Sequence, residues 1–265
     1  MPFAQRACLG PVPSDDLALA LRLADAADAL TLPRFRATDL RVTRKPDRTP
    51  VTDADTAAED ALRALVGAER PGDAVLGEEG GGDIAGAGRG WVFDPIDGTK
   101  NFSRGVPVWA TLIGLTVDGD PRVGVVSAPA LGRRWWAAPG EGAWSSDATG
   151  ARRISTSGVT DLADAYLSTT DARGFDGPGY PALCAAVWET RAFGDFWQHC
   201  LVAEGAIDVA VEAGASPWDL AALVPIVREA GGRLTGLSGA DTITGGDALT
   251  TNGPLHPAAL TVLHP

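Results

Sequence analysis

The sequence is poor in cysteine, contains no long apolar run and begins without a leader pattern. Its 265 residues include three cysteines, Cys8, Cys184 and Cys200, and none of them forms a Cys-x-x-Cys pair. This excludes a disulfide framework and a cysteine-rich zinc site, and it fits a reducing compartment. No stretch of about 18 apolar residues predicts a spanning helix. Met1–Arg6 lacks the basic start and apolar run of a signal peptide, so we expect a cytoplasmic protein.

Positive charge is also scarce. The chain has 22 Lys and Arg residues against 34 Asp and Glu residues, which gives a net charge of −12. Such a chain repels nucleic acid and anionic membranes, and we expect neither as a partner. It also repels a phosphorylated substrate unless a local positive source overrides the field. Divalent metal held by carboxylates is one such source. If this protein acts on phosphate esters, we therefore expect it to bind metal ions that supply the positive charge.

The sequence does contain enough apolar residues for a sizeable core, at 45% of the chain. Ser14 predicts the N-cap of a first helix, and residues 118–121 predict a hairpin between two strands. Residues 218–230 predict one helix that Pro225 kinks, because proline removes a backbone donor.

The two halves of the chain differ in pattern. Antiparallel strands dominate the first half, whereas strands and helices alternate in the second. A turn-like segment near residues 150–160 separates them. We therefore expect an α/β (α+β) fold with an N-terminal lobe at residues 1–155 and a C-terminal lobe at residues 156–265.

The strongest local feature is the hexapeptide Asp94-Pro95-Ile96-Asp97-Gly98-Thr99. Two carboxylates three residues apart with proline between them do not fit a regular strand. The chain must turn, and the turn can gather both carboxylates and the Ile96 carbonyl around one point. Mg²⁺ prefers such oxygen ligands, and Gly98 permits positive φ. Taken alone, however, such a pair of aspartates more often caps a turn.

Three further acidic positions favour the metal interpretation. Glu78 ends a short strand in Gly77-Glu78-Glu79, Asp219 opens a helix in Trp218-Asp219-Leu220-Ala221-Ala222, and Asp55 opens another helix. With these motifs the chain resembles the inositol monophosphatase family of metal-dependent, lithium-sensitive phosphatases. The resemblance covers nearly the whole chain. It implies a layered αβαβα sandwich of the inositol monophosphatase/fructose-1,6-bisphosphatase type.

The resemblance also implies individual roles. Up to three Mg²⁺ would be held by Glu78, Asp94, the Ile96 carbonyl, Asp97 and Asp219. Asp55 and Thr99 would position and deprotonate the attacking water, with Glu78 as a third catalytic residue. The amides of Gly98 and Thr99 would bind the phosphate oxygens, and Glu59 would hold a water of the weakest metal.

A narrower resemblance is to the histidinol-phosphate phosphatase branch of this family. It rests on Lys45–Asp55, Thr99–Phe102 and Gly194-Asp195-Phe196. It implies L-histidinol phosphate as the substrate, and the family suggests a homodimer. Glu212 matches the position that contacts the alcohol part of the substrate. Asp195 is suited either to contact an ammonium or imidazole or to cap the helix that follows it.

Three rival functions remain open from the sequence. The nearest rival is a phosphatase of the same family that acts on another substrate, namely an inositol phosphate such as inositol 1-phosphate, fructose bisphosphate or a 3′-phosphonucleotide. A phosphatase with Asp94 as covalent nucleophile is less consistent with the chain, because such enzymes space their acids at i and i+2. The third rival is a metal-binding module without catalysis.

Overall fold

The computed structural model describes residues 14–46 and 48–264, so Cys8 and Asp47 lie outside the described residues. Its helices are α1 (Asp15–Thr31), α2 (Asp53–Glu69), α3 (Thr99–Ser103), α4 (Gly179–Ala186), α5 (Asp195–Ala203), α6 (Pro217–Leu220), α7 (Leu223–Glu229) and α8 (His256–Leu263). Three short 3-10 helices are η1 (Pro129–Leu131), η2 (Leu162–Asp164) and η3 (Ala172–Gly174). No helix among these residues combines the length and apolar character that crossing a membrane requires.

The first sheet has eight strands in the order β10-β9-β8-β7-β6-β5-β3-β4. They are β3 (Ala74–Gly77), β4 (Gly81–Gly82), β5 (Arg89–Asp97), β6 (Ala110–Val117), β7 (Asp120–Ala128), β8 (Arg133–Ala138), β9 (Gly142–Asp147) and β10 (Gly150–Arg153). Only β3 and β5 pair in parallel, and the rest form an antiparallel meander that includes the predicted hairpin. A separate small hairpin joins β1 (Val42–Arg44) to β2 (Pro50–Thr52).

The second sheet has five strands in the order β12-β11-β13-β15-β14. They are β11 (Tyr166–Thr169), β12 (Glu189–Arg191), β13 (Val209–Ala213), β14 (Arg233–Thr235) and β15 (Asp247–Thr251). Strand β11 runs parallel to both neighbours, and β15 is antiparallel to both of its own. The chain passes from the first sheet to the second between Arg153 and Tyr166, which spans the predicted lobe boundary.

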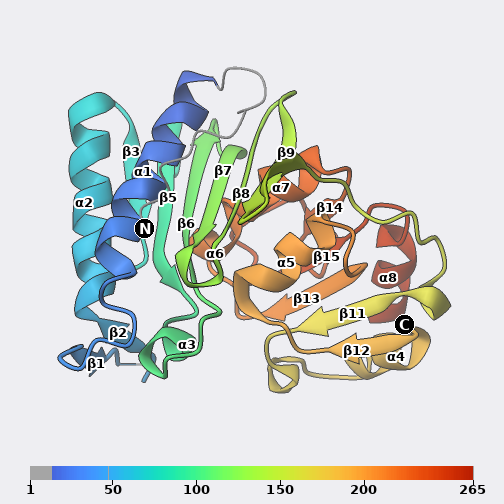
Figure 1. The fold of residues 1–265 in the computed structure, drawn as a ribbon. Coiled ribbons are helices and arrows are strands. Elements are labelled where there is room, and N and C mark those ends of the chain that lie inside the picture. Colours follow the sequence, from blue (N-terminus) through green and yellow to red (C-terminus); the bar gives the residue numbers. More distant parts are fainter. Residues whose placement is uncertain (1–13, 47, 265) are drawn as a thin grey trace.

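The two sheets and the helices form five layers (Figure 1). Helices α1 and α2 cover the outer face of the first sheet, α5, α6 and α7 lie between the sheets, and α4 and α8 cover the outer face of the second. This order confirms the predicted αβαβα sandwich. Successive residues of β8 supply both sides of the first sheet: Trp135 packs with Phe196 of α5, whereas Trp136 packs with Leu23 of α1.

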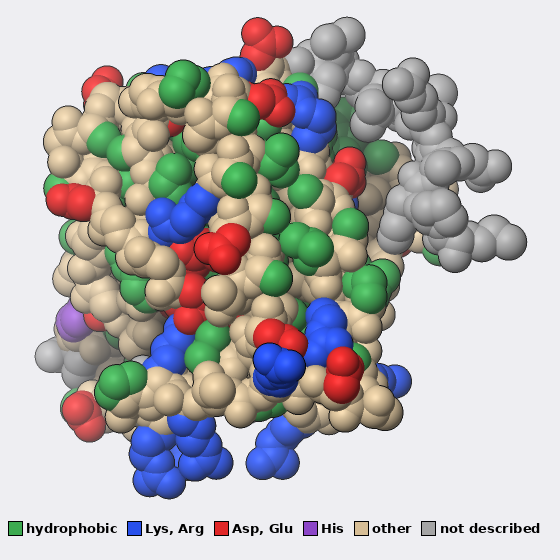
Figure 2. Space-filling view, turned by 90° about the vertical axis from the view of Figure 1, so that its left-hand side faces the viewer, with side chains coloured by type: hydrophobic (Ala, Val, Ile, Leu, Met, Phe, Trp, Pro, Cys, Tyr) green, Lys and Arg blue, Asp and Glu red, His purple; other side chains and the backbone are tan. Residues whose placement is uncertain are grey.

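The outer surface of the molecule on the side of α1 and α2 carries side chains of mixed character (Figure 2). Acidic and basic side chains are interspersed over it, and hydrophobic side chains are scattered rather than gathered into one patch. The net negative charge of the chain is therefore not spread as a uniform field over this face.

The predicted single helix over residues 218–230 is wrong in one respect. The helix is interrupted at Ala221 and Ala222, one turn before Pro225, rather than kinked at the proline itself. Proline has no N–H to donate to the carbonyl four residues earlier, and that carbonyl belongs to Ala221. The break divides the segment into α6 and α7, and the second piece ends before Gly231, as predicted.

The α6–α7 break packs directly on glycines of the first sheet, which gives a stability prediction. A Cβ added at Gly124 of β7 would lie 2.0 Å from the Ala222 carbonyl oxygen and 2.8 Å from Pro225 Cγ. Gly124→Ala should therefore destabilise the protein by roughly 3 kcal/mol or more, measured by thermal unfolding. The matched control is Gly67→Ala in α2, where nothing lies within 4 Å of the added Cβ. It should be neutral or stabilising. Equal melting temperatures for the two variants would contradict the close packing.

Candidate metal and substrate site

The site is built around the end of strand β5. Pairing of β5 with β6 is regular up to Asp94 and shifts register before Asp97, where Pro95 has no N–H to contribute. Two local bonds hold the irregular segment: Ile96 N donates to Asp94 Oδ1 at 3.0 Å, and Thr111 Oγ1 donates to the Pro95 carbonyl at 2.8 Å. Gly98 then takes φ 82°, a left-handed conformation that glycine adopts without strain.

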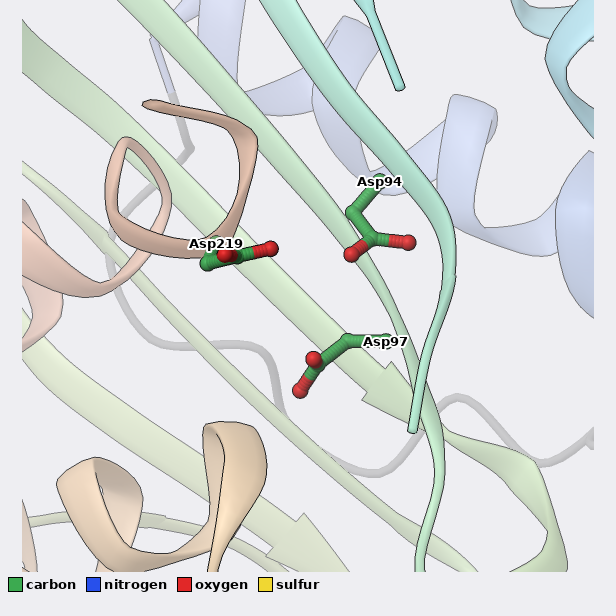
Figure 3. Close-up of side chains that lie close together, drawn as sticks. All are labelled: Asp94, Asp97 and Asp219. Carbon is green, nitrogen blue, oxygen red and sulfur yellow. The ribbon is translucent and has the colours of Figure 1, made fainter. Parts of the chain in front are cut away.

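A third carboxylate approaches from the opposite side. Asp219 lies in the first turn of α6, and Ser216 N donates to its Oδ2 at 2.7 Å in a capping box. One oxygen each from Asp94, Asp97 and Asp219 lies within 4.8 Å of the others. Figure 3 shows the three side chains turned toward one common space. An all-oxygen donor set of this kind suits a hard cation such as Mg²⁺.

Electrostatics point in the same direction. Burial, together with the charges of Glu78, Asp97 and Asp219, raises the pKa of Asp94 well above its usual range. Burial and the neighbouring carboxylates do the same to the pKa of Asp97. Burial first, and then Glu78, raises the pKa of Asp219 to about 7. The fold therefore disfavours ionisation of these three acids, and a divalent cation would supply the charge that favours it.

Glu78 borders this cluster but has a cationic partner of its own. It follows β3, and its Oε1 lies 2.7 Å from Lys45 Nζ. The same ammonium lies 2.8 Å from Glu79 Oε1. Burial alone would lower the pKa of Lys45, but its hydrogen bonds to the two glutamates raise it. This contact joins residues 33 positions apart and was not predicted from the sequence.

Glu59 binds the segment of chain that follows Glu78. Its carboxylate accepts hydrogen bonds from Glu79 N at 2.7 Å and Gly80 N at 2.8 Å. Arg63 Nε adds a bond at 2.7 Å from the next turn of α2. With its two oxygens held in this way, Glu59 fixes the chain just after Glu78, and its role toward a metal-associated water stays a prediction.

Asp55 and Thr99 meet beside the cluster. Thr52 caps α2, and both its amide (2.9 Å) and its hydroxyl (2.5 Å) donate to Asp55 Oδ2. Thr99 Oγ1 lies 3.3 Å from Asp55 Oδ1 and 2.9 Å from the Ile96 carbonyl oxygen. Burial raises the pKa of Asp55 to about 6, against the lowering effect of the Thr52 bonds. A carboxylate with this pKa can accept a proton near neutral pH.

The cluster opens into a cleft of two adjoining cavities, of about 660 and 520 Å³. Glu78, Asp94, Gly98 and Thr99 line the larger cavity, and Glu212 lines the smaller one. The cavities share several charged residues, namely Asp97, Lys100, Asp171, Arg173, Asp195 and Asp219. Lys45, Lys100 and Arg173 therefore place positive charge on the walls of an otherwise acidic cleft.

Asp195 belongs to the cleft and not to a helix cap. It is the first residue of α5 with φ 48°, and the cap position is Gly194. Its Oδ2 accepts a bond from Asn101 Nδ2 at 3.0 Å. The capping role falls to Asp97, whose Oδ2 accepts from Phe196 N at 2.6 Å. The N-cap interpretation of Asp195 is therefore wrong. Burial, and then Glu212, raises the pKa of Asp195 to about 6.

Comparison with known proteins agrees with this geometry. Residues 13–264 match the model described as the inositol monophosphatase family. The chain belongs to the inositol monophosphatase family. It is 58% identical over 255 residues to the histidinol-phosphatase of Mycobacterium tuberculosis, covering 94% of this chain and 98% of that protein. It is 50% identical over 260 residues to the histidinol-phosphatase of Streptomyces coelicolor, covering 94% and 97%.

Solved structures show the same fold. An inositol monophosphatase from Zymomonas mobilis superposes with a TM-score of 0.82 at 34% identity, covering 95% of this chain and 98% of that one. Within this family member, the structure gathers Asp94, Asp97 and Asp219 into one cluster. It places Glu78 against Lys45 at the edge of that cluster.

The sequence did not indicate the residues around Glu212. Thr170 Oγ1 donates to Glu212 Oε2 at 2.8 Å, and Gln198 Nε2 donates to the same oxygen at 2.5 Å. His199 is buried and lines the smaller cavity. None of these residues has a spacing that carries a signal, because strand β11, strand β13 and helix α5 meet only in the folded chain.

Proposed function

We propose that this protein is a Mg²⁺-dependent phosphomonoesterase that hydrolyses L-histidinol phosphate to L-histidinol and phosphate. The observation that carries the proposal is an acidic cavity next to an all-oxygen cluster: Asp195 and Glu212 line the wall beyond Asp97 and Asp219. Histidinol bears an ammonium and an imidazole, and carboxylates suit both. An inositol ring offers only hydroxyls. The greater identity to the two histidinol-phosphatases supports the same choice.

The metal would be held by five groups, namely Glu78, Asp94, the Ile96 carbonyl, Asp97 and Asp219, with up to three Mg²⁺ per chain. Bound divalent ions supply charge that polarises phosphoryl oxygens and lowers the pKa of bound water. In the structure Lys45 neutralises the carboxylate of Glu78, so a metal ion would have to replace Lys45 as the partner of Glu78. Lys45, which also pairs with Glu79, would then face the phosphate at the wall of the larger cavity.

The chain's own groups position the reactants. The Thr99 hydroxyl and the Asp55 carboxylate would orient the attacking water and accept its proton, with Glu78 beside them. The water oxygen forms a bond to phosphorus, the phosphorus–oxygen bond to histidinol breaks, and the alcohol oxygen takes up a proton. The amides of Gly98 and Thr99 would hold the phosphate oxygens, since the first amides of α3 have no acceptor within the helix.

A panel of phosphate esters tests the proposal. With Mg²⁺, kcat/KM for L-histidinol phosphate should exceed that for inositol 1-phosphate by tenfold or more, on the order of one charge-assisted hydrogen bond. Phosphate release should stop in EDTA. A preference for inositol 1-phosphate would overturn the substrate assignment and leave the reaction class in place. Release that is unaffected by EDTA would overturn the metal dependence.

We also propose that the enzyme is a cytoplasmic homodimer with neither nucleic acid nor membrane as a partner. The family resemblance supports the dimer. The two described cysteines, Cys184 and Cys200, are free thiols, which supports a reducing compartment. Light scattering of the purified protein gives the mass that decides the oligomeric state.

A further inference from the structure

Glu212 accepts hydrogen bonds from two donors outside its own strand. It lies near the end of β13 and lines the smaller cavity. Its Oε2 accepts from Gln198 Nε2 at 2.5 Å and from Thr170 Oγ1 at 2.8 Å, and His199 Nε2 lies 3.4 Å away. No described residue donates a hydrogen bond to Oε1. The described residues therefore engage one oxygen of this carboxylate and leave the other without a donor.

Gln198 is oriented by Glu212 and by Thr170. Its side chain is fully buried, and Nε2 also lies 3.3 Å from Thr170 Oγ1. Its Oε1 has no hydrogen-bond partner among the described residues. The reversed amide would direct that oxygen at an ionised carboxylate, which accepts but cannot donate. An unpaired buried oxygen carries a free-energy cost. Gln198 therefore donates to Glu212 through Nε2 while its own Oε1 stays unpaired.

His199 completes the support from the neighbouring position of α5. Its Nδ1 lies 2.8 Å from Thr250 Oγ1 on β15, the strand paired with β13. His199 Nε2 lies 3.4 Å from Glu212 Oε2, so one edge of the ring faces this carboxylate while the Thr250 hydroxyl contacts the other ring nitrogen.

We infer that Gln198 and His199 are positioning residues for substrate selection. They fix Glu212 so that Oε1 is presented to a cationic group of the substrate, an ammonium on the alcohol part of the phosphate ester. The choice of an amine-bearing ester rests on the proposed function. Gln198 lines neither cavity and acts through Glu212, whereas His199 contacts Glu212 and also lines the smaller cavity.

The test compares two substrates, L-histidinol phosphate and its analogue without the amino group. Gln198→Met, which keeps the length of the side chain and removes the donor, should raise KM for L-histidinol phosphate about tenfold. Its kcat and its KM for the amine-free analogue should stay within about twofold. His199→Phe should change KM in the same direction. The double variant Gln198→Met, Glu212→Gln should have the same KM for L-histidinol phosphate as Glu212→Gln alone. The reason is that Gln198 acts through the Glu212 carboxylate.

A matched control comes from the second buried histidine. His256 lies between Thr235 (3.1 Å) and Thr251 (3.0 Å) and lines neither cavity. His256→Phe should lower the melting temperature and leave both KM values unchanged. The inference would be overturned if KM rose equally for both substrates in the single variants. It would also be overturned if the increases in KM multiplied in the double variant. A wild-type enzyme that does not favour the amine-bearing ester would overturn the proposed function itself, and the inference with it.

Discussion

Replacing Asp94 by asparagine is expected to abolish Mg²⁺-dependent phosphate release and, at the same time, to raise the melting temperature of the metal-free protein. The neutral amide removes one charge from the ligand set, so activity should fall by roughly 10³-fold or more even in excess Mg²⁺. In EDTA the same change relieves the repulsion among buried carboxylates that raises the pKa of Asp94. The amide oxygen of the variant could still accept from Ile96 N, as the Asp94 carboxylate does now.

Two measurements decide this prediction: phosphate release across a Mg²⁺ titration, and thermal unfolding in EDTA at pH 8. The stability gain should be a few degrees, about 2–4 °C per kcal/mol for a chain of this size. Asp60→Asn, on an exposed position of α2, is the matched control and should change neither quantity. A melting temperature below that of the wild type would show that Asp94 is stabilising without metal, contrary to the structure.

The stability of the metal-free protein is expected to fall as pH rises from 5 to 8. The folded pKa is about 6 for Asp55 and about 7 for Asp219, both above the usual value near 4. Between these values the folded state binds protons that the unfolded chain has lost. The unfolding free energy therefore decreases with pH, and the stabilising contribution disappears as pH passes through the folded pKa values. The melting temperature in EDTA should drop on the order of 10 °C over this window.

Mg²⁺ should reverse the trend, because the cation favours the ionised carboxylates. The difference in melting temperature between Mg²⁺ and EDTA should therefore grow steadily from pH 5 to pH 8. Asp219→Asn should flatten the EDTA curve, since it removes one of the titrating groups. A constant difference across the range would mean that protons and metal do not compete for these acids.

Several local features of the structure follow from short stretches of sequence. The hexapeptide from Asp94 to Thr99 predicted an irregular strand end with converging oxygens, because proline and glycine restrict the backbone there whatever surrounds them. The capping of α2 and α6 by Thr52 and Ser216 is likewise local. The layered fold followed from the family resemblance and is confirmed by the sheet order.

Contacts between segments that lie far apart in the chain could not be predicted from the sequence. Lys45 lies between β1 and β2, and Glu78 follows β3, so the two meet only in the folded chain. Glu59 turned to backbone amides that no side-chain pattern encodes. The break at Ala221 was displaced from Pro225 by one turn, because the missing donor acts on a carbonyl earlier in the chain. For Lys45 and Glu59, tertiary packing decided between partners that the sequence left equal.

Divergence of substrate preference is constrained by the bond from Phe196 N to Asp97. The first turn of α5 is anchored on an oxygen of the metal motif, so a change there would also move a proposed ligand. Gln198 and His199 lie further along the same helix, against Glu212 and away from that anchor. Natural selection for a new alcohol group is therefore expected to accumulate substitutions at these later positions and to leave Gly194–Phe196 almost untouched.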